Sequence, residues 1–514
     1  MMGKVPLRRW CLTRLRRACL FLSFIGMLTL LVIAAFQAVN SSNITSYMSA
    51  SRSAISSASD VISIADDGTI RQARPIVQFY PDNQSKLFYR KASRDSERPA
   101  ELESPPAARR TGRRQSSSER ARIESLKDRV LSTEKRRNRG VQRPGALSNS
   151  DVSTDVHIFY YGWYTNPEID GQYSHWNHQY IPPWDKRDKR LYPTGSHDPT
   201  KGDIGSNFFP ELGAYSSRDP KVIDAHMKQM KKAGVGVIVF SWYPPGLADE
   251  NGKPSDELVP VLLDAAEKEG LKLALHVEPY QNLTVDNFKA HLQYVKEQYW
   301  DHPAFYKKKV GFRELPVFYI YDSYRVLPQQ WARLLSTQGD ISIRGTNLDA
   351  LFIGLLVEYK HKVDIKKGKF DGFYTYFAAN GFSYGSSWKN WKGLQDYAVK
   401  NSLMFIPSIG PGYVDTCIRP WNGATTRDRR GGEYYALGWR TALSFVPKMV
   451  SITSFNEWHE GSQIETAVPR PDINEGRHYL SYAPEESDFY LTETKRYVEQ
   501  FVNATVKLRP KKKF

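Results

Sequence analysis

A regular alternation of strand-like apolar runs with helical patterns is the feature of residues 151–514 that most restricts the possible folds. Seven helical stretches, the shortest of them a basic segment before 370–377, separate the runs, and 484–508 forms a closing helix. Continuous apolar strands that alternate with helices predict a parallel sheet covered on both faces. Eight such units predict a single (β/α)8 barrel of the TIM type. The eight predicted strands are 157–163, 235–242, 271–280, 315–322, 350–358, 370–377, 403–413 and 449–457.

Cap and turn residues support the helices of this pattern. Asp219 is a good N-cap, Pro220 suits a first turn, and Gly234 ends the helix predicted over 219–234. A doubly wound open sheet is the alternative architecture for the same alternation. Its nucleotide-binding versions carry a GxGxxG or GKS/GKT loop after the first strand, and no such loop follows 157–163.

The carboxyl ends of the predicted strands are polar and aromatic. A barrel holds its chemistry at these ends, and here seven of them combine aromatic residues with carboxylates, amides, a histidine or an arginine. Tyr and Trp offer an apolar body and a polar tip, which suits a sugar ring with its C–H face and its hydroxyl groups. We therefore expect a carbohydrate site. The seven ends read YYGWY, SWYPP, HVEPY, YIYDSY, YTYFAANGFSYG, GPGYVDTCIRPWN and FNEWHEG.

Two glutamates, Glu457 and Glu460, lie three positions apart in the segment SFNEWHEG at the carboxyl end of the last predicted strand. Glycosidic cleavage needs one protonated and one ionised carboxyl group on either side of one bond. Mutual repulsion and an aromatic wall would separate the two pKa values, and the group with the raised pKa would protonate the leaving oxygen. Glu278, Asp322 and Asp415 compete for these roles. A solvated loop or salt-bridge partners would be the non-catalytic interpretation of the pair.

Other reactive side chains of the body have weaker patterns. His459 is expected to pack or to form hydrogen bonds, because no HExxH motif accompanies it. Glu465 lies too far along the loop to be a first choice. Cys417 is the single cysteine after residue 150 and is expected to be a buried structural residue, since a nucleophilic role would require a partner base. We expect neither a metal nor a cofactor.

Seven motifs give the chain a resemblance to glycoside hydrolase family 99, the endo-α-1,2-mannosidases and endomannanases. They are FYYGWY, HWNH, SWYPP, HVEPY, FYIYDSY, PGYVDTCIRPWN and NEWHEGSQIE, and the resemblance covers 155–506. It implies a retaining endoglycosidase on a (β/α)8 barrel without a metal. The animal Golgi members that it resembles release Glc(1–3)Man from glucosylated high-mannose N-glycans. The motifs do not separate the endomannosidase from its endomannosidase-like paralogue.

The resemblance also implies roles for single residues. Glu460 would be the general acid/base, and Glu457 would take the proton of the substrate's 2-hydroxyl, which then forms a 1,2-anhydro sugar. His276 and Glu278 would hold the −1 sugar. Further substrate-binding residues would be Trp242 and Tyr243 at the −2 sugar, with Tyr160, Tyr319, Tyr321, Arg419, Trp421 and Asn456 lining the groove.

The first part of the chain predicts a membrane anchor. Residues 18–36 are uncharged and would span about 28 Å as a helix, enough to cross a bilayer core. Six basic residues and no acid precede them, which keeps the N-terminus cytoplasmic. We expect a cytoplasmic tail at 1–17, a transmembrane signal-anchor at 18–39, and a catalytic domain at 151–514. A cleaved signal peptide is the alternative, because small residues occur near 35–38, although its apolar core would be shorter.

Residues 40–150 are expected to be a flexible lumenal stem. They are rich in Ser, Arg, Ala and Pro, and such a composition buries too little apolar surface to fold. The topology resembles that of the Golgi members, which implies a single-pass type II protein of the Golgi membrane. N-glycosylation sequons support the lumenal side weakly and begin at Asn40, Asn43, Asn83, Asn282 and Asn503.

The net charge of +17 does not describe the body. Residues 151–514 contain 45 basic and 43 acidic side chains, so no basic surface for nucleic acid is predicted there. High-mannose N-glycans and the membrane are the expected partners. A type II Golgi glycosyltransferase would share the anchor and the stem, but no DxD motif stands at a predicted strand end. A catalytically silent glycan-binding barrel is the other alternative, and the intact glutamate pair argues against it.

Overall fold

The computed structural model describes residues 152–183, 186–249, 251, 253–471 and 477–508. The predicted cytoplasmic tail, the signal-anchor at 18–39 and the stem at 40–150 lie outside these residues. Among the helices that are described, none combines the length and the apolar character needed to cross a membrane.

Eight parallel staves form a closed barrel in the described body, where a stave is one strand, or two strands in line, along the barrel wall. The neighbours along the sheet run β8-β7-β6-β5-β3-β2-β1-β10-β9. Only Pro407 separates β8 from β9, so the two form one stave that pairs with β7 on one side and with β10 on the other. The predicted barrel is confirmed for this part of the chain, and the open sheet is excluded. The strands are β1 (Ser153–Tyr160), β2 (Val235–Trp242), β3 (Lys272–Val277), β5 (Arg313–Ile320), β6 (Leu351–Leu355), β7 (Gly372–Tyr374), β8 (Met404–Ile406), β9 (Ser408–Ile409) and β10 (Val450–Ile452).

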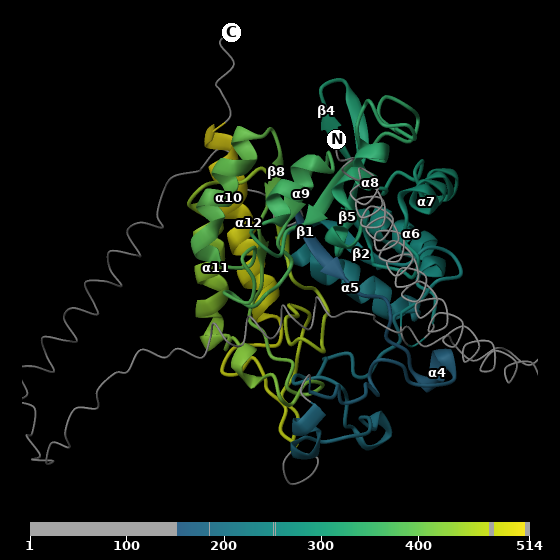
Figure 1. Ribbon diagram of the computed structural model, residues 1–514. Coiled ribbons are helices and arrows are strands. Elements are labelled where there is room, and N and C mark those ends of the chain that lie inside the picture. The colour runs from purple at the N-terminus through teal and green to yellow at the C-terminus, as the bar shows by residue number, and fades with distance from the viewer. Residues whose placement is uncertain (1–151, 184–185, 250, 252, 472–476, 509–514) are drawn as a thin grey trace, which may run out of the picture. The chain divides into compact units, whose positions relative to one another are not determined.

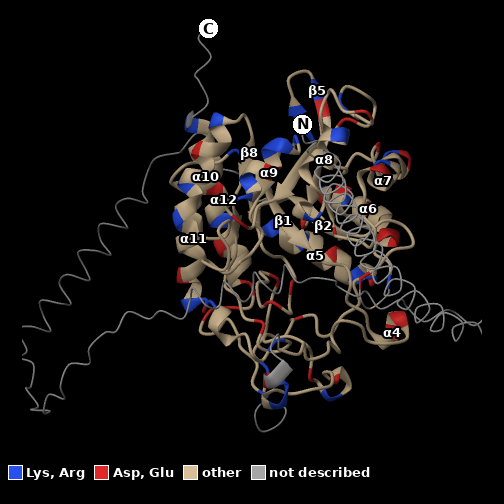
Figure 2. Cartoon of the chain, in the orientation of Figure 1, with Lys and Arg blue, Asp and Glu red and all other residues tan. Residues whose placement is uncertain are grey.

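A helix follows each stave and packs on the outside of the barrel (Figure 1). The charged side chains lie largely on the outer helices and loops, as Figure 2 shows. Helix α5 starts as predicted, because the side chain of Asp219 accepts a hydrogen bond from the backbone N–H of Lys221 and Pro220 occupies the first turn. The helices are α5 (Pro220–Lys232), α6 (Val259–Glu269), α7 (Val285–Gln298), α8 (Pro328–Leu335), α9 (His361–Lys367), α10 (Trp388–Lys400), α11 (Glu433–Leu443) and α12 (Phe489–Leu508).

Several local features differ from the predicted elements. The segment 255–270 divides into a 3-10 turn, η3 (Asp256–Leu258), and helix α6, because Pro260 fits only the first turn of an α-helix. A short strand, β4 (Lys307–Val310), pairs antiparallel with β5 as a hairpin that the sequence pattern did not indicate.

A long connection between β1 and α5 covers the carboxyl end of the barrel. The described residues between 161 and 218 contain a single helical turn, α4 (Pro167–Asp170), and two 3-10 segments, η1 (Lys186–Leu191) and η2 (Pro199–Lys201). Isolated bridges pair Phe208 with Leu480 and Pro210 with Ala467. The connection and the segment after β10 therefore form one layer, which lies below the barrel in Figure 1.

Aromatic rings fill the lumen of the barrel. Phe159, His276, Tyr319 and Tyr374 contact one another with ring centroids 4.8–5.7 Å apart, and all four are buried. Below them the hydroxyl of Tyr319 is hydrogen bonded to His157 Nδ1 at 2.7 Å. These rings form a closed floor, so any groove must lie above them, at the carboxyl ends of the strands.

Candidate active site

The loop after β10, residues 453–465, carries both glutamates and is folded back on itself; we call it the β10 loop. The backbone N–H of Ser454 donates to the carbonyl of Ser462 at 2.8 Å, and that of Ile464 donates to the carbonyl of Ser454 at 3.0 Å. Inside this closed turn the N–H of Glu457 donates to the hydroxyl oxygen of Ser454 at 2.8 Å. The backbone of both glutamates is therefore fixed by short local bonds.

Asn456 fastens the β10 loop to the end of β1. Its side-chain oxygen accepts from the N–H of Tyr161 at 2.8 Å, and its amide nitrogen donates to the carbonyl of the same residue at 2.8 Å. The hydroxyl of Tyr164 adds a bond to the carbonyl of Asn456 at 3.0 Å and accepts from the N–H of Trp458 at 3.1 Å. Asn456 is fully buried, so the structure gives it this fastening role and not the predicted position in an open groove.

Glu465 is an anchor that the sequence argument set aside. Its carboxylate is fully buried and accepts from Tyr215 Oη at 2.8 Å, Trp458 Nε1 at 3.0 Å and His226 Nε2 at 3.0 Å. Trp458, the residue between the two glutamates in the sequence, is thus tied to the far end of the same loop. His226 lies on α5, so this carboxylate links the loop to the outer helix layer.

The environment of Glu460 favours its protonated form. Burial raises the pKa of Glu460 to about 7, the nearby charge of Arg419 opposes this shift, and that of Asp415 adds to it. The carboxyl oxygen Oε2 is buried and has no hydrogen-bond partner among the described residues. Near neutral pH, a large fraction of this carboxyl group therefore carries a proton that it can donate.

Glu457 shares its surroundings with Glu460 and Glu278. The pKa of Tyr161 is well above its usual value, first because of burial and then because of the negative charges of Glu457 and Glu278, with a smaller effect of Glu460. The hydroxyls of Tyr161 and Tyr376 are hydrogen bonded to each other. Three carboxyl groups, from the ends of β3 and β10, thus lie near one pair of phenols from the ends of β1 and β7.

Glu278 and His276 join this group as predicted neighbours. The hydroxyl of Ser241 donates to Glu278 Oε1 at 2.8 Å, and His276 Nδ1 lies 3.1 Å from the same oxygen. The ring of His276 stacks on Tyr376 with an interplanar angle of 15° and bonds Tyr374 Oη through Nε2 at 2.7 Å. Tyr321 packs edge-on against His276, with centroids 5.2 Å apart, so it too lines the space above the lumen.

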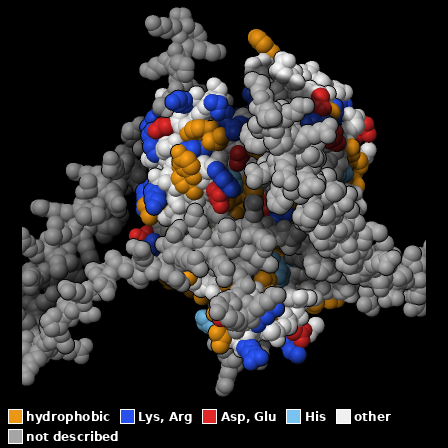
Figure 3. Space-filling view, viewed as in Figure 1, with side chains coloured by type: hydrophobic (Ala, Val, Ile, Leu, Met, Phe, Trp, Pro, Cys, Tyr) orange, Lys and Arg blue, Asp and Glu red, His pale blue; other side chains and the backbone are white. Residues whose placement is uncertain are grey.

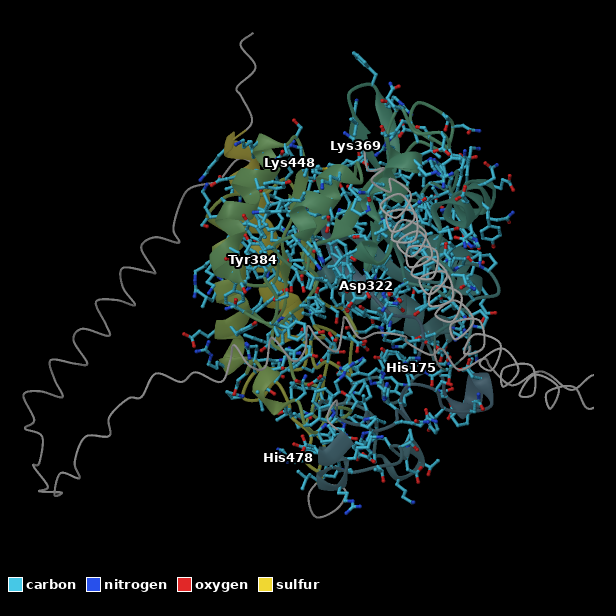
Figure 4. The ribbon with its side chains drawn as sticks, in the orientation of Figure 1. His175, Asp322, Lys369, Tyr384, Lys448 and His478 are labelled. Atoms are coloured by element: carbon cyan, nitrogen blue, oxygen red, sulfur yellow. The ribbon has the colours of Figure 1, made fainter. Side chains whose placement is uncertain are left out.

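The two competing aspartates are engaged elsewhere. Asp415 is fully buried and accepts from Arg419 Nη1 at 3.1 Å, from Asn422 and from Tyr413. Asp322, labelled in Figure 4, accepts from Tyr324 Oη at 2.6 Å and Arg325 Nε at 3.0 Å. Burial nevertheless raises the pKa of Asp322. Both aspartates serve to fix neighbouring loops.

Three of the predicted substrate-binding residues point away from this space. Tyr160 bonds His226 of α5 at 3.0 Å through its hydroxyl, on the helix side of β1. The indole of Trp242 donates to Asp256 of η3 at 2.7 Å, and the residue is only 1% exposed. Tyr319 belongs to the lumen floor. Their buried positions correct the expectation that these side chains line an open groove.

The other two predicted aromatic residues lie near the covering layer. Tyr243 follows β2 and is 7% exposed, and its backbone N–H donates a hydrogen bond to Ser255 Oγ at 3.2 Å. The indole of Trp421 donates to the carbonyl of Ile181 at 2.8 Å, which joins the loop after β9 to the connection 161–218.

Histidines that are separate in the sequence meet beside Glu460. The ring of His459 lies 4.6 Å from that of His178 and 5.5 Å from that of His175, which Figure 4 labels. Burial, followed by the charges of His178 and His175, lowers the pKa of His459 well below its usual value. Its Nδ1 is 2.6 Å from the carbonyl of Gly205, which supports a neutral, hydrogen-bonding role. No group of metal-ligating side chains suited to an ion occurs in the part of the chain that the structure describes.

Sequence reasoning missed Tyr161 and Tyr376 as site residues. Both stand in strand-end segments that were predicted to be polar and aromatic parts of the site, but neither residue was singled out within its segment. The usable signal was the alternation of side chains along β1: Phe159 contacts the lumen rings, Tyr160 contacts α5, and Tyr161 returns to the inside.

Comparison with known proteins places these residues among relatives. A family model described as Glycosyl hydrolase family 99 matches residues 151–503. The chain is 53% identical to the rat protein named glycoprotein endo-alpha-1,2-mannosidase, over 67% of this chain and 74% of that protein. It is 49% identical to the human glycoprotein endo-alpha-1,2-mannosidase-like protein, over 70% of this chain and 78% of that protein.

A solved structure shows the same fold. The GH99 endo-alpha-mannosidase from Bacteroides thetaiotaomicron superposes with a TM-score of 0.63 at 42% sequence identity. The match covers 69% of this chain and 99% of the bacterial chain. Nearly the whole of the bacterial chain therefore has a counterpart in this protein.

Proposed function

The chain belongs to glycosyl hydrolase family 99, and on this premise we propose that it is a retaining endo-α-1,2-mannosidase that releases Glc(1–3)Man from glucosylated high-mannose N-glycans. Family membership makes it a glycoside hydrolase; the product and the stereochemical course are the proposal. The observation that carries the proposal is Glu460, whose carboxyl oxygen Oε2 is buried and whose pKa is raised to about 7, on one tight loop with the buried Glu457. This is the acid that cleavage of an unactivated sugar–sugar bond requires.

In the first step of the proposed mechanism, Glu457 takes the proton of the 2-hydroxyl of the −1 mannose. The freed oxygen O2 bonds to the anomeric carbon while the bond from that carbon to the departing oxygen breaks. Glu460 gives its proton to the departing oxygen. The enzyme then holds a 1,2-anhydro sugar, with Glu457 protonated and Glu460 ionised.

The second step reverses these proton transfers. Glu460 takes a proton from water, and the water oxygen bonds to the anomeric carbon. The bond from that carbon to O2 breaks, and O2 recovers its proton from Glu457. Two inversions at one carbon give net retention, and both carboxyl groups return to their starting states.

Glu278 and Arg419 are the binding residues that the geometry supports best. Glu278 shares the surroundings of Glu457 through Tyr161, where it can accept bonds from sugar hydroxyls. Arg419 acts electrostatically on Glu460 and is itself held by Asp415, so it can donate to the glycan beside the acid. Tyr321 and Tyr243 supply aromatic surface near them.

The relatives also bear on where the protein acts. The names of the rat and Xenopus relatives, glycoprotein endo-alpha-1,2-mannosidase, support a role for this chain in glycan processing along the secretory pathway. We extend this to a type II protein of the Golgi membrane, anchored by 18–39 with its barrel in the lumen. Where Figure 3 shows described side chains on the surface, basic groups mix with acidic and apolar ones.

Two alternatives lose support. A Golgi glycosyltransferase does not agree with membership in a hydrolase family. A silent glycan-binding barrel would not need a carboxyl group with a pKa near 7 beside a second buried glutamate. The endomannosidase-like paralogue stays open, because the identities to the two named groups are 53% and 49%.

The test is product analysis with one defined glucosylated N-glycan and no sugar nucleotide. The purified body should release a disaccharide whose mass and sequence correspond to Glc(1–3)Man, and proton NMR during the first turnovers should show the α-anomer. Release of the β-anomer would contradict retention. Glycan binding without release would support the silent barrel.

A further inference from the structure

A buried arginine holds the backbone of the β10 loop directly after Glu460. Arg429 lies in the charged segment 427–432 between β9 and α11. Its Nη2 donates to the carbonyl of Gly461 at 2.9 Å and to that of Gln463 at 2.7 Å. The guanidinium therefore spans the turn by which the chain leaves Glu460 and returns toward Glu465.

Aromatic faces, and not a carboxylate, surround this cation. The guanidinium carbon lies 4.7 Å from the ring centre of Phe208, 5.0 Å from that of Tyr482 and 4.5 Å from that of Tyr490. The residue is 8% exposed, and its Nε and Nη1 have no hydrogen-bond partner among the described residues. Burying a charge in this way is unfavourable unless cation–π contacts and hydrogen bonds compensate. An apolar side chain could fill the space without that penalty, but it could not donate to the two carbonyls as Nη2 does.

The turn itself has little freedom. The N–H of Val414 donates to the carbonyl of Glu460 at 2.8 Å. Gly461 has a φ of +57°, and a Cβ there would lie 2.5 Å from Val414 Cγ1. The backbone of Glu460 is thus held by Val414 on one side of the turn and by Arg429 on the other. Tyr482, whose ring lies against the guanidinium, also donates to the carbonyl of Glu465 at 2.8 Å. The aromatic rings around Arg429 and the β10 loop are therefore packed together.

We propose that Arg429 is a positioning residue for the acid/base carboxyl of Glu460, a role that rests on the function proposed above. The role of Arg429 is geometric: it holds the backbone of the turn and so fixes where that carboxyl group points. Proton donation to a leaving oxygen depends steeply on geometry, and a displacement of about 1 Å can lower a rate on the order of 10²-fold. A lysine ammonium sits on a flexible, unbranched stem and lacks the planar guanidinium that lies against the three rings, so it cannot keep a donor between the two carbonyls in the same geometry.

Arg429→Lys, with Arg429→Met as the full deletion of the charge, tests this role. Arg430→Met is the matched control, because Arg430 is the next residue, is exposed, and forms only a 3.6 Å ion pair with the exposed Glu433. We expect kcat for disaccharide release to fall roughly 10–100-fold in Arg429→Lys, with KM within about twofold of wild type. Arg430→Met should match wild type in both. Melting temperatures of all variants report whether the fold is retained.

A second substrate separates positioning from general loosening. On a glycoside with an acidic phenol as leaving group, proton donation contributes little to the first step, so Arg429→Lys should lose much less of its rate of phenol release in the first turnover. An equal loss on both substrates would overturn the proposal, and so would a kcat equal to that of wild type. If Arg429→Met does not fold, the comparison of Arg429→Lys with wild type on the two substrates is the test of the proposal. Failure of the wild-type protein to release disaccharide would instead contradict the proposed function.

Discussion

Glu460 is a carboxyl group that the surrounding residues hold near the middle of its titration at neutral pH. Burial raises its pKa to about 7, while Arg419 and Asp415 act on it in opposite directions. Because Arg419 is itself bonded to Asp415, these two side chains form a pair whose balance adjusts the acid. The strength of the acid is thus decided by individual neighbours and not by the fold as such.

The pH dependence of kcat/KM follows from this balance. Below about pH 7 Glu460 is protonated and can donate, and above it the proton is lost, so kcat/KM should fall as the pH rises through that value. Arg419→Gln removes the charge that lowers the pKa and should move this decline to higher pH. Asp415→Asn should move it to lower pH. Rate profiles of the three proteins check both directions, and a decline that shifts the same way in both variants would contradict the assignment.

The residue scale also shows what sequence patterns could and could not predict. Short motifs pointed to Glu457, Glu460, His276 and Glu278, and the structure brings these residues together; their catalytic and binding roles stay predictions. Tyr160 and Trp242 were placed on the wrong side of their strands, since side chains alternate between the two faces and an error of one position reverses the direction. A resemblance between motifs does not tell which face of the strand a side chain points to, whereas the pairing register of the strands does.

At the scale of elements, the β10 loop depends on buried polar anchors from distant parts of the chain. Asn456 binds the end of β1, Glu465 reaches α5 through His226, and Arg429 comes from the loop after β9. These contacts join residues more than 30 positions apart, and most of them join residues more than 200 apart. No local pattern predicts such pairs, which is why Glu465 was set aside on its distance along the chain.

Removal of the Glu465 carboxylate should destabilise the whole barrel. Glu465→Ala leaves three buried donors, on Tyr215, Trp458 and His226, without their acceptor. Breaking a buried hydrogen-bonded charge typically costs about 3–5 kcal/mol in the free energy of unfolding. Urea unfolding measures this, with Glu314→Ala on the exposed start of β5 as the control, expected to change stability by less than about 0.5 kcal/mol. An equal effect of both substitutions would show that the network carries no stability.

At the scale of the molecule, the barrel was predictable and its details were not. Alternating apolar runs and helices indicated eight units, and the structure closes them. Three of the staves contain stretches of only two or three paired residues, at β7, β8 with β9, and β10, so the predicted strands were too long there. The β4–β5 hairpin escaped prediction because Lys307–Val310 has no alternation of apolar and polar residues. The layer 161–218 lacks long periodic elements and could be located only in three dimensions.

The stability of the body should not depend on its redox state. Cys417 is the only cysteine after residue 150 and is free and buried, so no disulfide staples the barrel. A chain shortened to 151–514 should melt at the same temperature with and without a reductant, within about 1 °C, because burial in a domain of this size supplies enough stabilisation. Differential scanning calorimetry under both conditions checks this. A lower melting temperature in the reductant would point to an intermolecular disulfide between bodies.

Single-turnover release of disaccharide by Glu460→Gln, compared with wild type on the same glucosylated N-glycan, tests the two-glutamate site most directly. Glutamine keeps the shape of the side chain but cannot donate the proton, so the rate should fall on the order of 10²–10⁴-fold while the dissociation constant for the glycan stays within a few-fold. A release rate close to that of wild type would contradict the assignment of Glu460 as the acid.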